Sequence, residues 1–172
     1  MSVTTVQAGD STLLLGIYTG LNEEQRDRFL RDIPHLFETM RELTGISPRS
    51  VTPYWALTVL PHEPIGGGAS GTNSLVTCDD LSIISHEMFH WWNGTTVETT
   101  PDANWIKEGF TKYYEGKTLY SAGLWSFDEF REHLDKLYER RGLEFVGIDG
   151  QWLPINLVPV SYTHLTLPTK RI

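Results

Sequence analysis

The pattern of apolar and polar residues along the chain predicts a definite order of strands and helices. Two apolar runs bounded by turn-forming residues predict strands at Thr12–Thr19 and Tyr54–Leu60. Apolar residues at helical spacing predict four helices, at about 22–45, 79–94, 102–117 and 126–142. The order strand, helix, strand and then helices only is typical of an α+β fold and not of alternating β/α units.

Polar residues and glycines mark the ends of these predicted helices. Asn22 with Gln25, and Ser126 with Glu129, match the capping-box pattern of a helix N-terminus. Pro34 lies inside the first helix and predicts either a kink there or two consecutive helices. The expected helix ends are glycines, namely Gly45, Gly94 and Gly142.

The composition is that of a folded acidic chain. Of its 172 residues 40% are hydrophobic and 12% aromatic, which is enough for a sizeable core. The 14 Lys and Arg against 22 Asp and Glu, a net charge of -8, argue against nucleic-acid binding and against a polybasic membrane anchor. A single cysteine, Cys78, excludes an intrachain disulfide and a cysteine-based zinc site. No spanning segment or signal peptide is expected, and the compartment and oligomeric state stay open.

The main chemical signal is the motif His86-Glu87-Met88-Phe89-His90. Residues four apart share one face of a helix, so the imidazoles of His86 and His90 can bind one ion. Glu87 lies beside them, where a base is needed to take a proton from metal-bound water. A catalytic zinc site needs a third protein ligand, and an antiparallel return of the next predicted helix would bring Glu108 to the histidines. The alternative is a chance match to a short motif.

Other ionisable residues of the chain have alternative interpretations. Glu115 lies two helical turns after Glu108 on a similar face, which makes it a candidate partner for orienting a ligand histidine. A solvated charge on the helix surface is the alternative interpretation of Glu115. His35, His62 and His133 are isolated, and we expect them at the surface or at helix caps.

These motifs resemble those of the glycyl aminopeptidases, a gluzincin metallopeptidase family whose longer members often carry a PDZ domain. The chain reads H-E-x-x-H-x-W-N over 86–93 and E-G-x-T-x-Y-Y over 108–114, and the resemblance covers roughly 10–125. It implies part of a thermolysin-like catalytic domain, with a small N-terminal sheet followed by active-site helices. It further implies one Zn²⁺ per chain held by His86, His90 and Glu108, and peptide hydrolysis with Glu87 as general base.

The glycine-rich segment departs from the family pattern. The family usually reads G-G-x-E-H there, and its Glu is taken to hold the amino terminus of the substrate, but Ser70 occupies that position. A hydroxyl cannot pair with an ammonium as a carboxylate does, so exopeptidase and endopeptidase action both stay open. We expect Gly67, Gly68 and Ser70 to bind the substrate as an edge strand. The motifs are also compatible with a leukotriene-hydrolase-like aminopeptidase and with a catalytically impaired metal-binding scaffold.

The C-terminal residues match a translated sequencing adapter. Val160–Thr169 corresponds in frame to the end of a transposon-based library adapter, and an ordinary threonine-rich strand is the alternative. We therefore expect residues 1–158 to be part of a metallopeptidase catalytic domain and residues 159–172 to be an artefact. Such a fragment would leave apolar surface exposed, so we expect poor folding and little activity from it.

Overall fold

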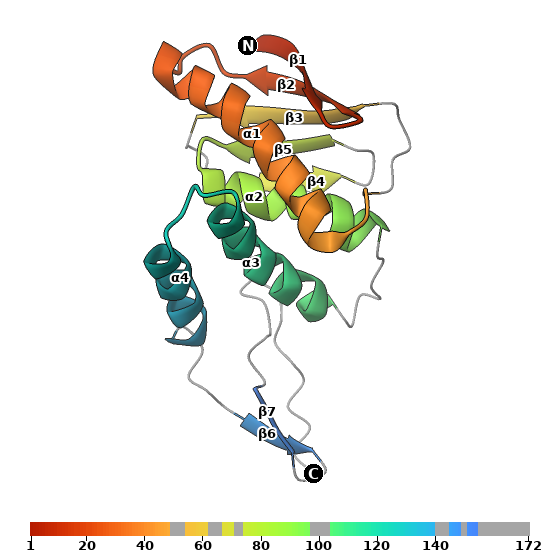
Figure 1. Cartoon of the computed structure of the whole chain (residues 1–172), viewed down its shortest axis with the longest axis vertical. Helices are drawn as coiled ribbons and strands as arrows, with labels where there is room; N and C mark the ends of the chain where they lie inside the picture. The colour runs from red at the N-terminus through yellow and green to blue at the C-terminus, as the bar shows by residue number, and fades with distance from the viewer. Residues whose placement is uncertain are drawn as a thin grey trace.

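A mixed five-stranded sheet with helices on one side forms the body of the protein (Figure 1). This computed structural model describes residues 1–48, 54–61, 67–70, 74–96, 104–139, 145–148 and 151–154. The sheet has the strand order β1-β2-β3-β5-β4. Its strands are β1 (Ser2–Ala8), β2 (Ser11–Ile17), β3 (Trp55–Leu60), β4 (Gly67–Ser70) and β5 (Ser74–Cys78). The outer pairs β1–β2 and β4–β5 are antiparallel, whereas β2–β3 and β3–β5 are parallel.

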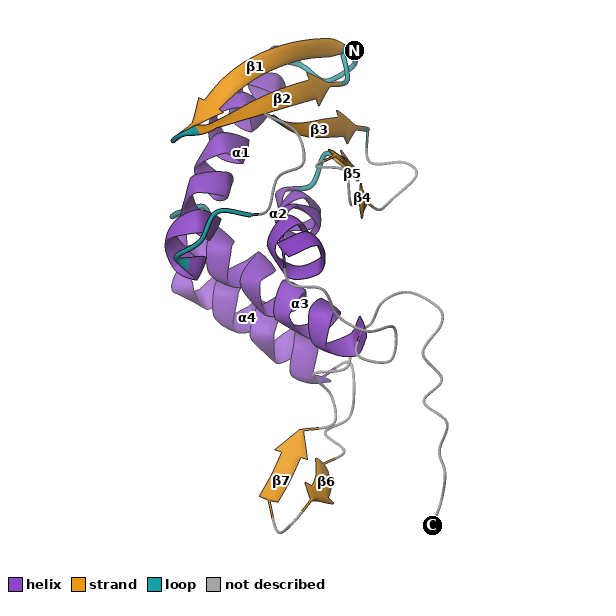
Figure 2. Cartoon of the chain, turned by 90° about the vertical axis from the view of Figure 1, so that its right-hand side faces the viewer, coloured by secondary structure: helices purple, strands orange, loops and turns teal. Residues whose placement is uncertain are grey.

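The helices form two successive layers beside this sheet (Figure 2). They are α1 (Glu23–Thr44), α2 (Leu81–Phe89), the irregular helical turn η1 (Trp91–Thr96), α3 (Asn104–Ser121) and α4 (Phe127–Glu139). Helices α1 and α2 contact the sheet, α3 packs on both of them, and α4 packs on α3. A separate antiparallel hairpin consists of β6 (Phe145–Ile148) and β7 (Gln151–Pro154). None of the described helices is long and apolar enough to span a membrane.

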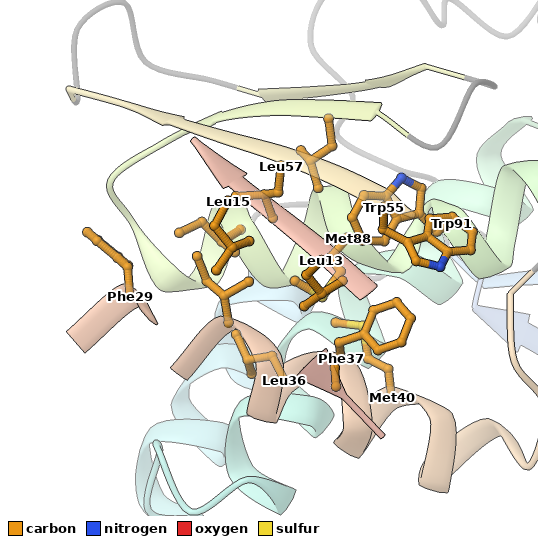
Figure 3. Packing of buried hydrophobic residues seen from close by; sticks show 14 of the residues in the cluster. Leu13, Leu15, Phe29, Leu36, Phe37, Met40, Trp55, Leu57, Met88 and Trp91 are labelled. Carbon is orange, nitrogen blue, oxygen red and sulfur yellow. The ribbon is translucent and has the colours of Figure 1, made fainter. Parts of the chain in front are cut away.

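The core lies between the sheet and the first two helices (Figure 3). In β3 the inward side chains of Trp55, Leu57 and Val59 are buried, as the two-residue period of a strand requires. Phe37 of α1 meets the ring of Trp55 at 6.0 Å between centroids and that of Trp91 at 6.1 Å. Aromatic burial of this kind contributes strongly to stability, and it anchors the residues directly after α2 in the core.

The sequence correctly predicted β2, β3 and most of the helix boundaries. The Asn22–Gln25 capping box forms at the start of α1, and Gly45 ends that helix with a φ of 70°. Ser126 and Glu129 likewise exchange hydrogen bonds at the start of α4. Of the two alternatives predicted at Pro34, two consecutive helices are excluded, because α1 runs as one helix through the buried Pro34.

Other predicted boundaries were wrong as well. Helix α2 ends at Phe89 and not at Gly94, since Asn93 and Gly94 leave helical geometry in η1. The α+β class is confirmed, but the expected absence of further strands was wrong, because β1, β5 and the β6–β7 hairpin are present. Strand β1 is mostly exposed and polar, so it has no strong apolar alternation that would have revealed it. Residues 159–172 lie outside the described residues.

Candidate metal centre

Helix α2 brings two histidines to a face that α3 covers. Asp80 caps the helix by accepting a hydrogen bond from the Ser82 amide at 2.8 Å. The hydroxyl of Ser85 donates to the Glu115 carbonyl at 3.1 Å, which fixes α2 against α3. His90, at the C-terminal end of α2, approaches Glu108, which precedes Glu115 in α3. The two helices therefore run in opposite senses, as the expected return of Glu108 to the histidines requires.

His86, His90 and Glu108 converge on one point between the two helices. The Oε2 atom of Glu108 lies 3.3 Å from Nε2 of His86 and 3.6 Å from Nε2 of His90. One ligand atom from each of the three residues lies within 4.8 Å of the others. Zinc bonds of about 2.0–2.1 Å at tetrahedral angles place neighbouring ligand atoms about 3.3–3.5 Å apart. The two distances to Glu108 therefore fit a tetrahedral ion, and the two-nitrogen, one-oxygen donor set suits zinc.

Glu115 holds the far side of the His86 ring. It is only 4% exposed, and its Oε2 lies 3.0 Å from Nδ1 of His86. The ammonium of Lys112 donates to the same oxygen at 2.7 Å. A carboxylate at Nδ1 keeps a proton on that nitrogen, so Nε2, on the side of Glu108, is the nitrogen that can bind an ion. Burial and these contacts exclude the alternative in which Glu115 is a solvated surface charge.

The turn η1 supplies a comparable partner for His90. Nδ1 of His90 donates to the carbonyl of Asn93 at 3.3 Å, and the Thr111 hydroxyl lies 3.4 Å from the same nitrogen. The Asn93 amide donates to the Thr111 hydroxyl at 3.2 Å and also to the Lys107 carbonyl. The non-helical angles of Asn93 and Gly94 turn the Asn93 carbonyl back toward the histidine. Sequence reasoning assigned no role to Asn93 or Thr111, although both stand in the motifs it quoted.

The two histidines have opposite electrostatic surroundings. Burial by itself lowers the pKa of His86, but hydrogen bonds to Glu108 and Glu115 outweigh it and raise that pKa to about 9. Burial and the positive charge of His86 lower the pKa of His90 to about 4. Burial tends to raise the pKa values of Glu108 and Glu115, yet their cationic neighbours bring both below the usual range. Without metal, the proton held by His86 therefore offsets part of the negative charge of Glu108 and Glu115.

Glu87 is half-buried beside the ligand set. Burial raises the pKa of its carboxyl, and the negative charges of Glu108 and Glu115 add to the increase, against the opposing effect of His86. A carboxyl with a raised pKa is suited to accept a proton and then to release it. These surroundings are compatible with a general base at this position.

The predicted substrate segment lies on an edge strand. Gly67, Gly68 and Ser70 form β4, which ends the five-stranded sheet and pairs antiparallel with β5, placing Gly68 opposite Val76. Strand β4 also contacts α2, the helix that carries both histidines. The segment expected to bind an extended peptide is therefore beside the helix that carries His86.

The fold is similar to that of solved aminopeptidase and leukotriene A4 hydrolase structures. An aminopeptidase N family protein from Idiomarina loihiensis superimposes with a TM-score of 0.60 at 18% identity, over 75% of this chain and 27% of that one. Native yeast leukotriene A4 hydrolase does so with a TM-score of 0.51 at 20% identity, over 69% of this chain and 20% of that one. At these identities the similarity establishes the fold alone.

Sequence comparison finds a similarity to one peptidase family. Residues 79–145, which include the whole candidate ligand set, match the model of the M61 glycyl aminopeptidase family. This match confirms the resemblance inferred from the motifs. A leucine aminopeptidase 2 from Sclerotinia sclerotiorum is 26% identical over 108 residues, or 58% of this chain. The chain spans only 17% of the length of that relative.

Proposed function

We propose that this chain carries the catalytic core of a zinc-dependent metallopeptidase that hydrolyses peptide bonds in the manner of an aminopeptidase. The observation that supports it most is the approach of Glu108 to both His86 and His90 at distances that fit one tetrahedral ion. The family match over 79–145 supports the same activity and a peptide substrate.

The residues of the centre then have three roles: binding the metal, orienting a ligand and transferring a proton. His86, His90 and Glu108 would hold one Zn²⁺, and Glu115 would orient His86. A bound Zn²⁺ supplies a Lewis acid that polarises water and the peptide carbonyl. Glu87 takes the proton from the attacking water and returns it to the leaving amine. The raised pKa of Glu87 favours this exchange, because a weaker acid holds the proton more readily.

The peptide would lie along β4 as an additional strand. An edge strand offers unpaired amide and carbonyl groups to an extended chain, and the contact of β4 with α2 brings that chain near the centre. Gly67 and Gly68 would contribute backbone contacts, and Ser70 would stand near the position of the substrate amino terminus. A matched pair of peptides, one free and one acetylated at its amino terminus, separates aminopeptidase from endopeptidase action.

The Glu87→Gln variant tests the proposed chemistry. Both chains should bind one zinc with equal affinity, measured by elemental analysis and by competition with a chromogenic chelator. The zinc-dependent hydrolysis of amino-acid anilides, however low in the unmodified chain, should be lost only in the variant. Equal hydrolysis by both chains would contradict the role of Glu87, and absence of zinc binding would contradict the metal site.

Two specific observations favour different functions. Ser70 in place of a carboxylate favours a metal-binding scaffold with impaired catalysis, which predicts zinc binding without hydrolysis in either chain. The 25% sequence identity over 108 residues to a leukotriene A-4 hydrolase homolog from Botryotinia fuckeliana favours an aminopeptidase of that type. Hydrolysis of free but not acetylated peptides, together with hydrolysis of leukotriene A4, would support an aminopeptidase of the leukotriene-hydrolase type.

A further inference from the structure

Helix α4 reaches the candidate centre through one side chain, His133. Its Nε2 lies 2.9 Å from the carbonyl oxygen of Lys112, and its Nδ1 lies 4.0 Å from Oε1 of Glu115. The sequence predicted a surface or cap position for His133, but the ring lies between α3 and α4, against Trp125 at 5.4 Å between centroids. A residue outside the family motifs therefore contacts the carboxylate that holds His86.

The hydrogen bond to Lys112 fixes how this ring is presented. A carbonyl oxygen can only accept, so Nε2 of His133 must carry the hydrogen that is donated. The opposite nitrogen, Nδ1, then faces the Glu115 carboxylate, and it can donate to that carboxylate only when the ring carries a hydrogen on both nitrogens. The Nε2 edge of the ring is thus bonded to the backbone of α3, and the Nδ1 edge faces Glu115.

Gly116 provides the space that this contact needs. A Cβ atom at position 116 would lie 2.6 Å from Cδ2 of His133 and 3.1 Å from its Nε2. Glycine within a helix is less favourable than alanine by about 1 kcal/mol, so local propensity disfavours it here. A close approach of the two helices at this position explains why a side chain is absent.

The two carboxylate oxygens of Glu115 have separate neighbours. Oε2 receives His86 and Lys112, whereas Oε1 faces His133. The terminal torsion of a glutamate is broad, so contacts at one oxygen alone leave the carboxylate plane free to rotate. The doubly protonated ring of His133 places a positive donor near the second oxygen, which restricts that rotation and helps to offset the cost of burying the charge.

We propose that His133 is a positioning residue for the metal centre, which holds Glu115 in the orientation that directs Nε2 of His86 toward the ion. This inference rests on the proposed metal site and adds α4 to it. Residues that act on a metal through its ligands typically change metal affinity by about 10- to 100-fold when replaced. Because His133 acts through Glu115, the lower value is expected.

Two replacements of His133 distinguish the contact with Glu115 from the contact with Lys112. The amide of glutamine can occupy the Nε2 position and keep the bond to Lys112, whereas that of asparagine lies near the Nδ1 position, beside Glu115. We expect His133→Gln to lower zinc affinity about 10-fold and His133→Asn to restore most of it. The d–d absorption bands of the Co²⁺-loaded chain should shift in His133→Gln, because the geometry at His86 changes.

His35→Gln is the matched control. The Nε2 of His35 also bonds a backbone carbonyl, that of Ala122, at 3.0 Å. Unlike His133, however, His35 is exposed and is not among the residues in contact with the centre. Zinc affinity and the Co²⁺ spectrum should therefore stay unchanged in this variant. Circular dichroism confirms the fold of each variant.

A second variant tests the proposal without altering His133. Gly116→Ala should displace the ring and reproduce both the affinity loss and the spectral shift, even if His133→Gln does not fold. Wild-type affinity and spectra in the folded His133→Gln or Gly116→Ala chains would overturn the role of His133 while leaving the metal site intact. Absence of metal binding in the unmodified chain would instead contradict the proposed function itself.

Discussion

Replacing Glu115 by glutamine removes a buried charge while keeping the shape of the side chain. The carboxylate is 4% exposed and receives Nδ1 of His86 at 3.0 Å and Nζ of Lys112 at 2.7 Å. The glutamine oxygen can still accept from His86, but it no longer carries the charge that makes this imidazole a strong ligand. The effect should therefore appear in metal affinity as well as in stability.

The expected magnitudes follow from these contacts. Loss of a partner behind a metal ligand lowers affinity by about 10- to 100-fold, which corresponds to about 1.4–2.8 kcal/mol. In the metal-free chain, weakening hydrogen bonds to a charged group costs about 1.5–3 kcal/mol. The lower part of that range is expected, because the Lys112 side chain is 31% exposed and can turn to water.

The surface pair of Glu132 with Lys136 offers a matched control. Its nitrogen and oxygen atoms are also 2.7 Å apart, but the Glu132 side chain is 64% exposed. Pairs of this kind contribute about 0–1 kcal/mol, so Glu132→Gln should leave zinc affinity unchanged and stability nearly so. Chelator competition measures affinity, and urea denaturation of the metal-free chains measures stability.

Comparing Glu115→Gln with Glu132→Gln shows whether the burial of Glu115 and its contact with His86 contribute to zinc affinity. A Glu115→Gln chain with the zinc affinity of the Glu132→Gln chain would refute the assignment of Glu115 as the partner of His86. Equal affinity with lower stability would restrict Glu115 to a structural role.

Three further predictions concern other parts of the structure. The Thr111 hydroxyl donates to the Lys107 carbonyl at 2.8 Å, so Thr111→Val should lower the free energy of unfolding by about 1–2 kcal/mol and weaken zinc binding. Thr111→Ser, which keeps the hydroxyl, should recover both. Thr118→Val is the control for Thr111→Val: its buried hydroxyl has no hydrogen bond to any described residue, so the free energy of unfolding should stay unchanged. Because the pKa of His86 is raised to about 9, zinc binding at pH 7 should release about one proton. Zinc affinity should therefore increase as the pH rises toward 9. Equal calorimetric binding enthalpies in buffers of different ionisation enthalpy would contradict this proton release. Phe37→Ala should cost about 3–5 kcal/mol in urea denaturation, whereas Val76→Ala, at a 48% exposed position, should stay within about 0.5 kcal/mol.

Local patterns were sufficient to predict that the three residues of the candidate ligand set lie together. Helical spacing alone places His86 and His90 on one face of α2. The position of Glu108 depended on α3 returning antiparallel to α2, which the short connection suggested and the contact between Ser85 and Glu115 reflects. The caps of α1 and α4 were predictable for the same reason, since each involves residues three apart.

Contacts between distant segments could not be predicted in this way. The end of α2 depends on hydrogen bonds from Asn93 to α3, so the glycine at position 94 was a misleading stop signal. Strand β1 owes its conformation to pairing with β2, and its own side chains are mostly exposed. His133 contacts Glu115 only because α4 packs closely on α3 at Gly116, and no local pattern encodes that approach.

Zinc K-edge X-ray absorption of the loaded chain measures whether His86, His90 and Glu108 share one ion. One zinc per chain is expected, with two imidazole nitrogens and a carboxylate oxygen at about 2.0–2.2 Å. In the Glu108→Ala variant the carboxylate ligand should disappear and the affinity should fall, while both imidazoles remain bound. A spectrum that lacks the two imidazoles, or that is identical in the Glu108→Ala chain, would contradict this metal centre.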